Sequence, residues 1–193
     1  PKTERYGNPG FIAILKQISN LWKTNSESVL ASSEQVTKVI QSMATTTPGE
    51  LLTEETLKYA YEQLRDTFDY IYGGFGSSPK FPTPHNYTFL LRWWKRSNDP
   101  MALEIVLKSL DRMGRGGIYD QLGGGFHRYS TDEYWFVPHF EKMLYDQAML
   151  LMAYIETFQV TRNEEFAQTA RETITYVLRD LTDKKGGFLS AED

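Results

Sequence analysis

Residues 115–147 read RGGIYDQLGGGFHRYSTDEYWFVPHFEKMLYDQ, and this stretch carries more information about fold and function than any other. It contains five glycines, two of the three histidines and a run of aromatic and acidic residues. Connections in compact domains usually have about 4–6 residues, and longer ordered loops tend to be functional. Glycines let backbone segments approach closely, aromatic rings offer flat apolar surface, and His127, His139 and Glu141 supply titratable groups. The stretch therefore predicts the wall of a functional site.

Helical periodicity dominates the remainder of the chain. One apolar stripe covers residues 11–22 and a narrower one covers residues 29–43. The segment TTTPGE (45–50) interrupts the pattern and is the expected domain boundary. The sequence thus divides into residues 1–50 and residues 51–193.

Five more helices are expected after the boundary. Their apolar stripes run, in order, from Leu57 to Ile71, Tyr87 to Trp94, Leu103 to Met113, Phe140 to Tyr154 and Phe166 to Leu181. Thr53 and Asp99 are expected N-caps, Gly114 is an expected helix stop, and Thr161 with Glu164 has capping-box spacing. Because no segment shows a convincing strand alternation, the predicted fold class is all-α.

The connections between these helices alternate in length. Residues 97–99 and 159–163 are short links, whereas 72–84, 115–137 and 186–193 are long and rich in glycine and aromatic residues. Successive packed helices reverse direction, so every second connection lies at the same end of the array. The three long loops should therefore share one face, as in a helical-hairpin solenoid or closed toroid whose binding surface lies on the loop side.

The motifs resemble one known family. RYGNPGF (5–11), GGFGSSPKFP (73–82), GGIYDQLGGGFHRYSTDEYWFVPHFEKMLYDQA (116–148) and GGFLSAED (186–193) are similar to the spermatogenesis-associated, thioredoxin-domain-bearing proteins. The resemblance implies a partial (α/α)6 toroid over residues 51–193, like the toroids of N-acylglucosamine 2-epimerases and six-hairpin glycosidases. It also implies that residues 1–50 hold the final helix of a thioredoxin-like domain, absent here, and a helical connector.

His127, His139 and Glu141 are the candidate catalytic residues. His127 follows a glycine run and should face the cavity, unless it is a buried histidine bonded to backbone. The sixth helix is expected to begin at about Pro138, which would place His139 and Glu141 in its first turn. There His139 could satisfy backbone groups or pack on Trp135, and Glu141 would gain from the helix dipole whatever its function.

A second group of residues is expected to bind substrate. Its members lie in or near the glycine-aromatic loops and offer hydroxyl partners, charge or flat rings: Phe75, Lys80, Asp120, Gln121, Arg128, Tyr129, Trp135 and Asp146. Several of them also have a structural interpretation. Asp120 could hold a turn, the aromatic rings could be toroid core, and Asp146 could form an ion pair on a solvated helix face together with His139 and Lys142.

Composition excludes several classes of function. The net charge of −4 gives no electrostatic footprint for nucleic acid or an anionic membrane, and the chain has no cysteine. No apolar run approaches the about 20 residues of a spanning helix, so a cytoplasmic location is expected. LGGGFHR (122–128) lacks dinucleotide-binding spacing, and nothing fixes a metal geometry for the histidines. Neither a metal nor another cofactor is expected.

Two functions remain open. The first is a carbohydrate-active domain that transfers protons on a sugar with a histidine pair, or hydrolyses a glycoside with two carboxylates. The available carboxylates are Asp120, Glu141, Asp146, Glu192 and Asp193. The second is a recognition module that presents clients to the thioredoxin-like domain. Exposed apolar stripes on a partial toroid would also favour self-association of the chain.

Overall fold

The computed structural model describes residues 1–45, 49 and 51–192, and its chain divides into two compact units, Pro1–Leu51 and Leu52–Asp193. Most of the segment 45–50, where the sequence predicts the boundary, lies outside the described residues. The two units are treated separately below.

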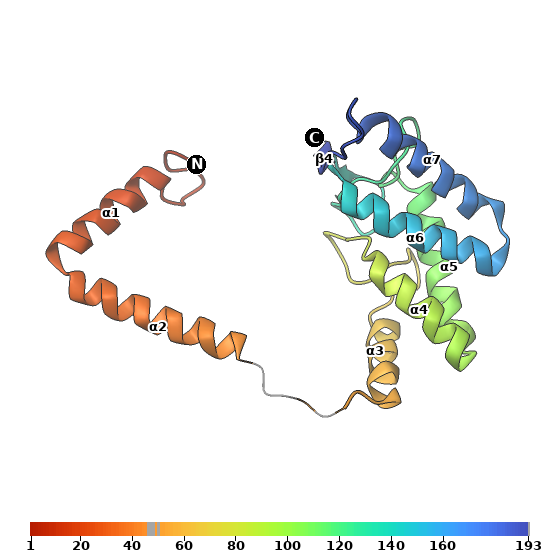
Figure 1. The fold of residues 1–193 in the computed structure, drawn as a ribbon, viewed down its shortest axis with the longest axis horizontal. Coiled ribbons are helices and arrows are strands. Elements are labelled where there is room, and N and C mark those ends of the chain that lie inside the picture. The colour runs from red at the N-terminus through yellow and green to blue at the C-terminus, as the bar shows by residue number, and fades with distance from the viewer. Residues whose placement is uncertain (46–48, 50, 193) are drawn as a thin grey trace. The chain divides into compact units, whose positions relative to one another are not determined.

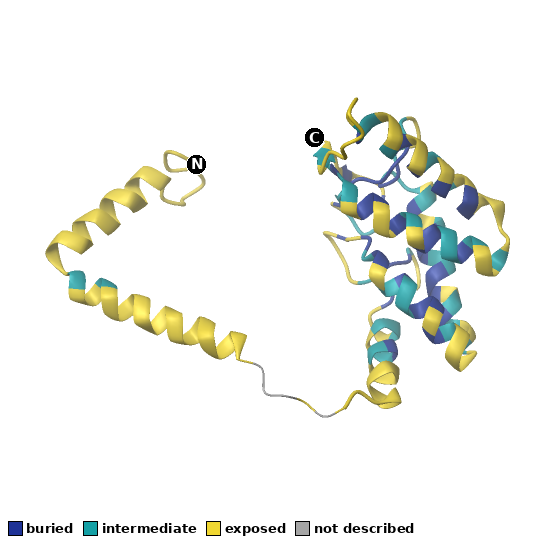
Figure 2. Ribbon diagram, viewed as in Figure 1, coloured by how far each residue is buried: buried dark blue, intermediate teal, exposed yellow. Residues whose placement is uncertain are grey.

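The first unit consists of two exposed helices. α1 spans Phe11–Thr24 and α2 spans Ser26–Ala44, and the side chain of Asn25 caps α2 by accepting a hydrogen bond from the Ser28 N–H. Neither helix buries a residue within the described part of the chain, and Figure 2 shows both almost entirely exposed. The apolar stripe of α1 therefore has no partner within its own unit.

The second unit is all-α in class, as predicted, with five of the seven described helices (Figure 1). The helices are α3 (Glu54–Asp66), α4 (Pro84–Ser97), α5 (Pro100–Arg115), α6 (Leu144–Thr161) and α7 (Glu164–Asp180). The helices α4 and α5 form one packed hairpin and α6 and α7 form a second, while α6 also packs along α4. Two hairpins side by side build the array.

The helix ends depart from the prediction in detail. Asp99 caps α5 as expected, through the Met101 N–H. The cap of α7 is Asn163, not Thr161, because the amide of Asn163 already accepts a hydrogen bond from the Glu165 N–H. α5 continues through Gly114 to Arg115, and α3 ends before Phe68, which packs into the core from the following loop.

The core lies between α4, α5 and α6 and continues into the long loops. Its largest fully enclosed side chains come from both sources: Tyr87, Leu90, Ile105, Leu110, Leu150 and Tyr154 from helices, and Ile118, Phe126 and Trp135 from the loop 116–143. The long loop is thus a packed part of the fold.

The expected start of the sixth helix at Pro138 is wrong. Residues 138–143 instead form two short strands, β2 (Pro138–His139) and β3 (Lys142–Met143), and α6 begins only at Leu144. β2 pairs with β1 (Tyr129–Ser130), and β3 pairs with β4 (Ala191–Glu192), both antiparallel. Backbone partners in other segments, one near in the sequence and one far, take the hydrogen bonds that a helix would have used.

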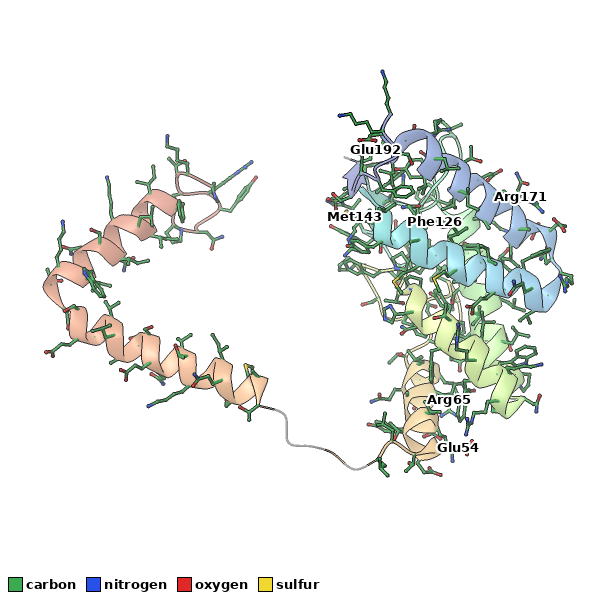
Figure 3. The ribbon with its side chains drawn as sticks, viewed as in Figure 1. Glu54, Arg65, Phe126, Met143, Arg171 and Glu192 are labelled. Atoms are coloured by element: carbon green, nitrogen blue, oxygen red, sulfur yellow. The ribbon has the colours of Figure 1, made fainter. Side chains whose placement is uncertain are left out.

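The three long loops meet on one face, as predicted. Lys80 of the first loop pairs with Ser130 of the second through two backbone hydrogen bonds of 2.8 and 2.9 Å. Met143, at the end of the second loop, pairs with Ala191 of the third. Figure 3 shows the same approach of Met143 and Glu192 at the start of α6.

Each long loop begins with the same compact turn. We call residues 68–75 turn 1, 119–126 turn 2 and 182–188 turn 3; in each, the first and last residues form an isolated antiparallel bridge. Their second residues are the aspartates Asp69, Asp120 and Asp183. Each aspartate donates its N–H to a glycine carbonyl at 2.8–2.9 Å and accepts a glycine N–H on its own carbonyl at 2.9–3.0 Å. The turn is therefore an internal repeat of the fold.

Candidate functional site

An arginine stands at the centre of the candidate site, at the start of α6 on the loop face. The arginine cluster comprises Phe81, Arg128, Tyr129, His139, Tyr145 and Asp146. The guanidinium of Arg128 lies over the rings of Phe81 (5.3 Å) and Tyr145 (5.2 Å). Its Nη1 donates to Asp146 Oδ2 at 3.1 Å. Among the described residues no side-chain partner takes its Nε or Nη2, so two donors in a fixed plane are left for a ligand.

Asp146 supplies the titratable carboxyl of the cluster. It is 5% exposed in the first turn of α6. Burial raises the pKa of its carboxyl to about 6, an effect that Arg128 partly offsets and the charge of Glu141 reinforces. A carboxyl with a pKa near neutrality can both accept and donate a proton under ordinary conditions.

His139 is open to solvent and joins the cluster through Tyr129, whose ring lies 4.8 Å from that of Phe81. Its ring stacks on Tyr129, its register partner across β1 and β2, with centroids 4.9 Å apart. It does not pack on Trp135, and it does not lie in a helix. Glu141 is also outside any helix, and its backbone carbonyl accepts the Arg128 N–H at 2.6 Å. Because α6 starts only at Leu144, Glu141 lacks the predicted place in its first turn and the helix dipole expected to favour it there, and His139 has no first-turn backbone groups to satisfy.

His127 has a different environment. It is 8% exposed, meets the edge of Phe140 at 5.2 Å, and its Nδ1 has no partner among the described residues. Burial lowers the pKa of its imidazole, and the nearby charge of Lys142 adds to this effect. Both effects favour the neutral form of His127, and one of its buried nitrogens has no hydrogen-bond partner among the described residues.

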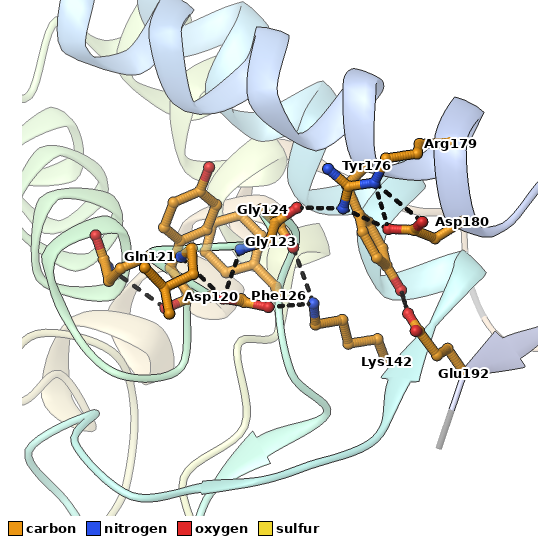
Figure 4. A network of polar contacts seen from close by, with 12 residues as sticks. Asp120, Gln121, Gly123, Gly124, Phe126, Lys142, Tyr176, Arg179, Asp180 and Glu192 are labelled. Carbon is orange, nitrogen blue, oxygen red and sulfur yellow. Dashed lines mark hydrogen bonds and ion pairs between the residues drawn. The ribbon is translucent and has the colours of Figure 1, made fainter.

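Lys142 ties the second loop to its own turn. Its Nζ donates to Asp120 Oδ2 at 2.7 Å and to the Gly124 carbonyl at 2.9 Å, and it lies 4.3 Å from the ring centre of Tyr176 (Figure 4). Burial raises the pKa of Asp120, but its backbone hydrogen bonds and Lys142 outweigh this and lower that pKa to about 2. The pair is a permanent ionic contact.

Lys80 makes the equivalent contact in the first loop. This lysine is completely buried, and its Nζ donates to Asp69 Oδ2 at 2.5 Å and to the Glu133 carbonyl at 3.0 Å. It also lies over the ring of Trp135 at 5.3 Å. Trp135 is itself fully enclosed, and its Nε1 donates to the Tyr72 carbonyl.

Five of the predicted substrate-binding residues therefore have structural contacts. Lys80 and Trp135 are wholly buried and their polar atoms bond within the chain, so their contact with a ligand stays a prediction. Asp120 holds turn 2, Phe75 stacks on Tyr87 at 5.7 Å, and Gln121 donates to the carbonyls of Gly114 and Gly116. Their alternative readings, core packing and turn formation, describe their contacts.

Arg128, Tyr129 and Asp146 do come together, with His139 and Glu141 beside them. Sequence reasoning missed Phe81 and Tyr145, which complete the arginine cluster. Tyr145 lies in the first turn of α6 and could have been found had the helix start been placed correctly. Phe81 lies in the first loop, and no local pattern links it to Arg128, 47 residues later.

The described residues offer no group of three histidines or acidic residues able to hold a metal ion. In the same residues no helix is long and apolar enough to cross a membrane. A groove of about 460 Å³ lies between α5 and α7, lined by Arg115, Glu165 and Glu172 among others, and contains none of the arginine cluster.

The hairpin array has the fold of the (α/α)6 toroids. Sugar epimerase from a ruminal bacterium matches 69% of this chain over 37% of its own, with a TM-score of 0.61 and 14% identity. Cellobiose 2-epimerase from Bacillus thermoamylovorans aligns with 72% of this chain and 40% of its own, with a TM-score of 0.62 and 13% identity. Cellobiose 2-epimerase from Spirochaeta thermophila aligns with 71% of this chain and 39% of its own, with a TM-score of 0.57 and 20% identity. At such identities the likeness defines the fold alone.

Sequence relatives identify the family. Spermatogenesis-associated protein 20 from Homo sapiens is 40% identical over 192 residues, and that from Rattus norvegicus is 39% identical; both alignments cover 95% of this chain. The chain is thus a homologue of spermatogenesis-associated protein 20, which confirms the predicted family resemblance. It spans about a quarter (24%) of the length of these relatives. No family model matches the chain.

Proposed function

We propose that residues 52–192 form a sugar-binding toroid domain that transfers protons on a bound sugar, as an epimerase or isomerase does. The observation that carries this proposal is the arginine cluster. It combines a planar donor, a buried carboxyl with a pKa of about 6 and an exposed imidazole stacked on Tyr129. Sugar epimerases share this fold, which supports the choice of substrate class.

The residues have distinct roles in this mechanism. Arg128 binds the carbonyl oxygen of the open-chain sugar with its remaining N–H groups, which stabilises the negative charge that develops when the neighbouring carbon loses its proton. Asp146 and His139 are the two proton-transfer groups, one for removal and one for return. Tyr129 and Phe81 supply the apolar walls. His127, with its neutral ring and unsatisfied Nδ1, is a third candidate acid or base.

Two observations keep other functions in view. Burial is the main cause of the raised pKa of Asp146, and the charge of Glu141 adds to it; two neighbouring carboxyl groups are also what a glycoside hydrolase needs, so hydrolysis is the second reaction to test. The apolar stripe of α1 is exposed along its length, as expected of a helix that packs on an absent domain. A recognition module that serves a thioredoxin-like domain is therefore the non-enzymatic alternative.

Calorimetry and proton-exchange NMR test the proposal. Neutral reducing sugars such as cellobiose and mannose should bind, and the proton next to the carbonyl should exchange with deuterated solvent. Arg128→Met and Asp146→Asn should each abolish exchange. The matched control is Arg92→Met, which breaks an exposed ion pair with Glu156 between α4 and α6. Binding without exchange would favour the recognition module, and no response to any sugar would refute the proposal.

A further inference from the structure

The turns share more than their backbone. In turn 1, Asp69 Oδ1 accepts the N–H groups of Ile71 and Tyr72, both at 2.9 Å. In turn 2, Asp120 Oδ1 accepts those of Leu122 and Gly123, at 3.0 and 2.8 Å. The spacing from the aspartate is the same in both turns. One oxygen of each carboxylate is thus committed to holding its own turn.

The second oxygen of each carboxylate accepts a buried lysine from the segment that follows the turn. Lys80 bonds Asp69 Oδ2 and lies four positions before the start of α4. Lys142 bonds Asp120 Oδ2 and lies two positions before the start of α6. Each lysine also donates to a backbone carbonyl and covers an aromatic ring. The lysine therefore fixes the start of the next helix against the preceding turn.

Turn 3 is one residue shorter and repeats part of this arrangement, with the second N–H group four residues after the aspartate instead of three. Asp183 Oδ1 accepts the N–H groups of Lys185 and Gly187, at 2.8 and 2.9 Å. Asp183 is exposed, and among the described residues no lysine reaches its Oδ2. The carboxylate oxygen that accepts a lysine in turns 1 and 2 therefore has no lysine partner in turn 3 among the described residues.

An apolar groove lies beside this turn. It has a volume of about 370 Å³ between α6 and α7, and Phe188 of turn 3 forms part of its wall together with Leu144, Leu151, Ile174, Val177 and Leu178. Leu178 and Phe188 are each 60% exposed, which is unusual for apolar side chains gathered in one place. β4 then brings the chain past turn 3 to the start of α6, because it pairs with β3.

We propose that this groove and turn 3 together seat an amphipathic helix that carries a lysine two to four residues before its first turn. The lysine binds Asp183 Oδ2, and the apolar stripe of the helix fills the groove, as α6 lies along α4. The occupant is the next helix of one polypeptide, in the position that the repeat gives it. The relatives are about four times as long as the aligned stretch, so such a polypeptide has room for it.

The test extends the 193-residue chain by a copy of residues 142–161, which begins with a lysine and has the required pattern. Because the chain has no cysteine, Leu178→Cys introduces a single thiol into the groove. Its rate of chemical labelling in dilute solution should fall by about tenfold or more when the appended helix covers it. Leu122→Cys, on a fully exposed residue of turn 2, should label equally fast in both chains.

The lysine contact is tested by a double-mutant cycle. Asp183→Asn, or methionine in place of the copied lysine, should each restore most of the fast labelling, and the two changes together should add nothing further. Asp66→Asn, at an exposed aspartate outside the turns, is the matched control. Labelling that the extension does not slow, slowing that survives Asp183→Asn, or a thiol already protected in the unextended chain would each overturn the proposal. None of these readouts depends on sugar binding.

Discussion

Asp146 shows how one residue links the site to stability. Its side chain is buried, and burial raises its pKa to about 6 from the 3.8 of a solvent-exposed aspartate, so folding favours the protonated form. The stability that this preference contributes is complete below about pH 4 and is lost as the pH rises through 6. Arg128 reduces the loss without abolishing it, because the guanidinium is itself partly exposed.

Replacing this carboxyl should therefore alter the pH dependence of folding. We expect the free energy of unfolding of Asp146→Asn, relative to the wild type, to rise by on the order of 3 kcal/mol between pH 4 and pH 7. Urea denaturation at a series of pH values measures it. Asp69, Asp120 and Asp132 have lowered pKa values, so they stabilise the fold as the pH rises. Both proteins contain these residues, so their effect cancels when the two free energies of unfolding are subtracted. Parallel profiles for the two proteins would contradict the assignment.

At the scale of elements, local pattern predicted the helices and their hairpin order but not the loop interior. The spacing of Phe140, Met143 and Leu144 fits a helix, yet residues 138–143 are extended. Their backbone groups pair with β1, which is near in the sequence, and with β4, which is far away. The spacing of apolar residues carries no information on such pairing partners. The buried contact of Lys80 could not be predicted for the same reason: a lysine in a polar loop is normally exposed, and only its distant aspartate, Asp69, makes burial tolerable.

The lysine–aspartate contacts should be costly to break. Lys80→Met leaves Asp69 partly buried without its partner, because the aspartate side chain is only 16% exposed. The expected loss is about 3 kcal/mol in the free energy of unfolding, at the lower end for a buried pair, since two backbone N–H groups still bind the carboxylate. Chemical denaturation measures the loss, and the exposed pair Arg92–Glu156 is the control, with Arg92→Met costing less than about 1 kcal/mol.

A second change separates the charge from the packing. If the cost arises from the unpaired carboxylate, adding Asp69→Asn to Lys80→Met should recover part of the stability. A double variant that is as unstable as the sum of its two single variants would instead show that Lys80 contributes through its contacts with Trp135 and the Glu133 carbonyl.

For the whole molecule, the two surfaces that lack apolar partners predict its behaviour in solution. The stripe of α1 exposes Phe11, Ile18 and Trp22 by 52–61%, and the groove between α6 and α7 exposes Leu178 and Phe188 by 60%. The two lie in different units, and each unit leaves its own surface uncovered. Water-exposed apolar area of this extent favours association of one chain with another.

We therefore expect the 193-residue chain to self-associate as its concentration rises. Light scattering coupled to size-exclusion chromatography measures this as an average mass above the 22.3 kDa of one chain. Ile18→Glu and Leu178→Glu should each lower the mass at a given concentration, because a charge on either surface opposes its burial. Lys38→Glu, on exposed α2 outside the α1 stripe, is the control for added negative charge. A chain that stays monomeric at every concentration would show that neither surface drives association, and an effect of only one variant would identify the surface that does.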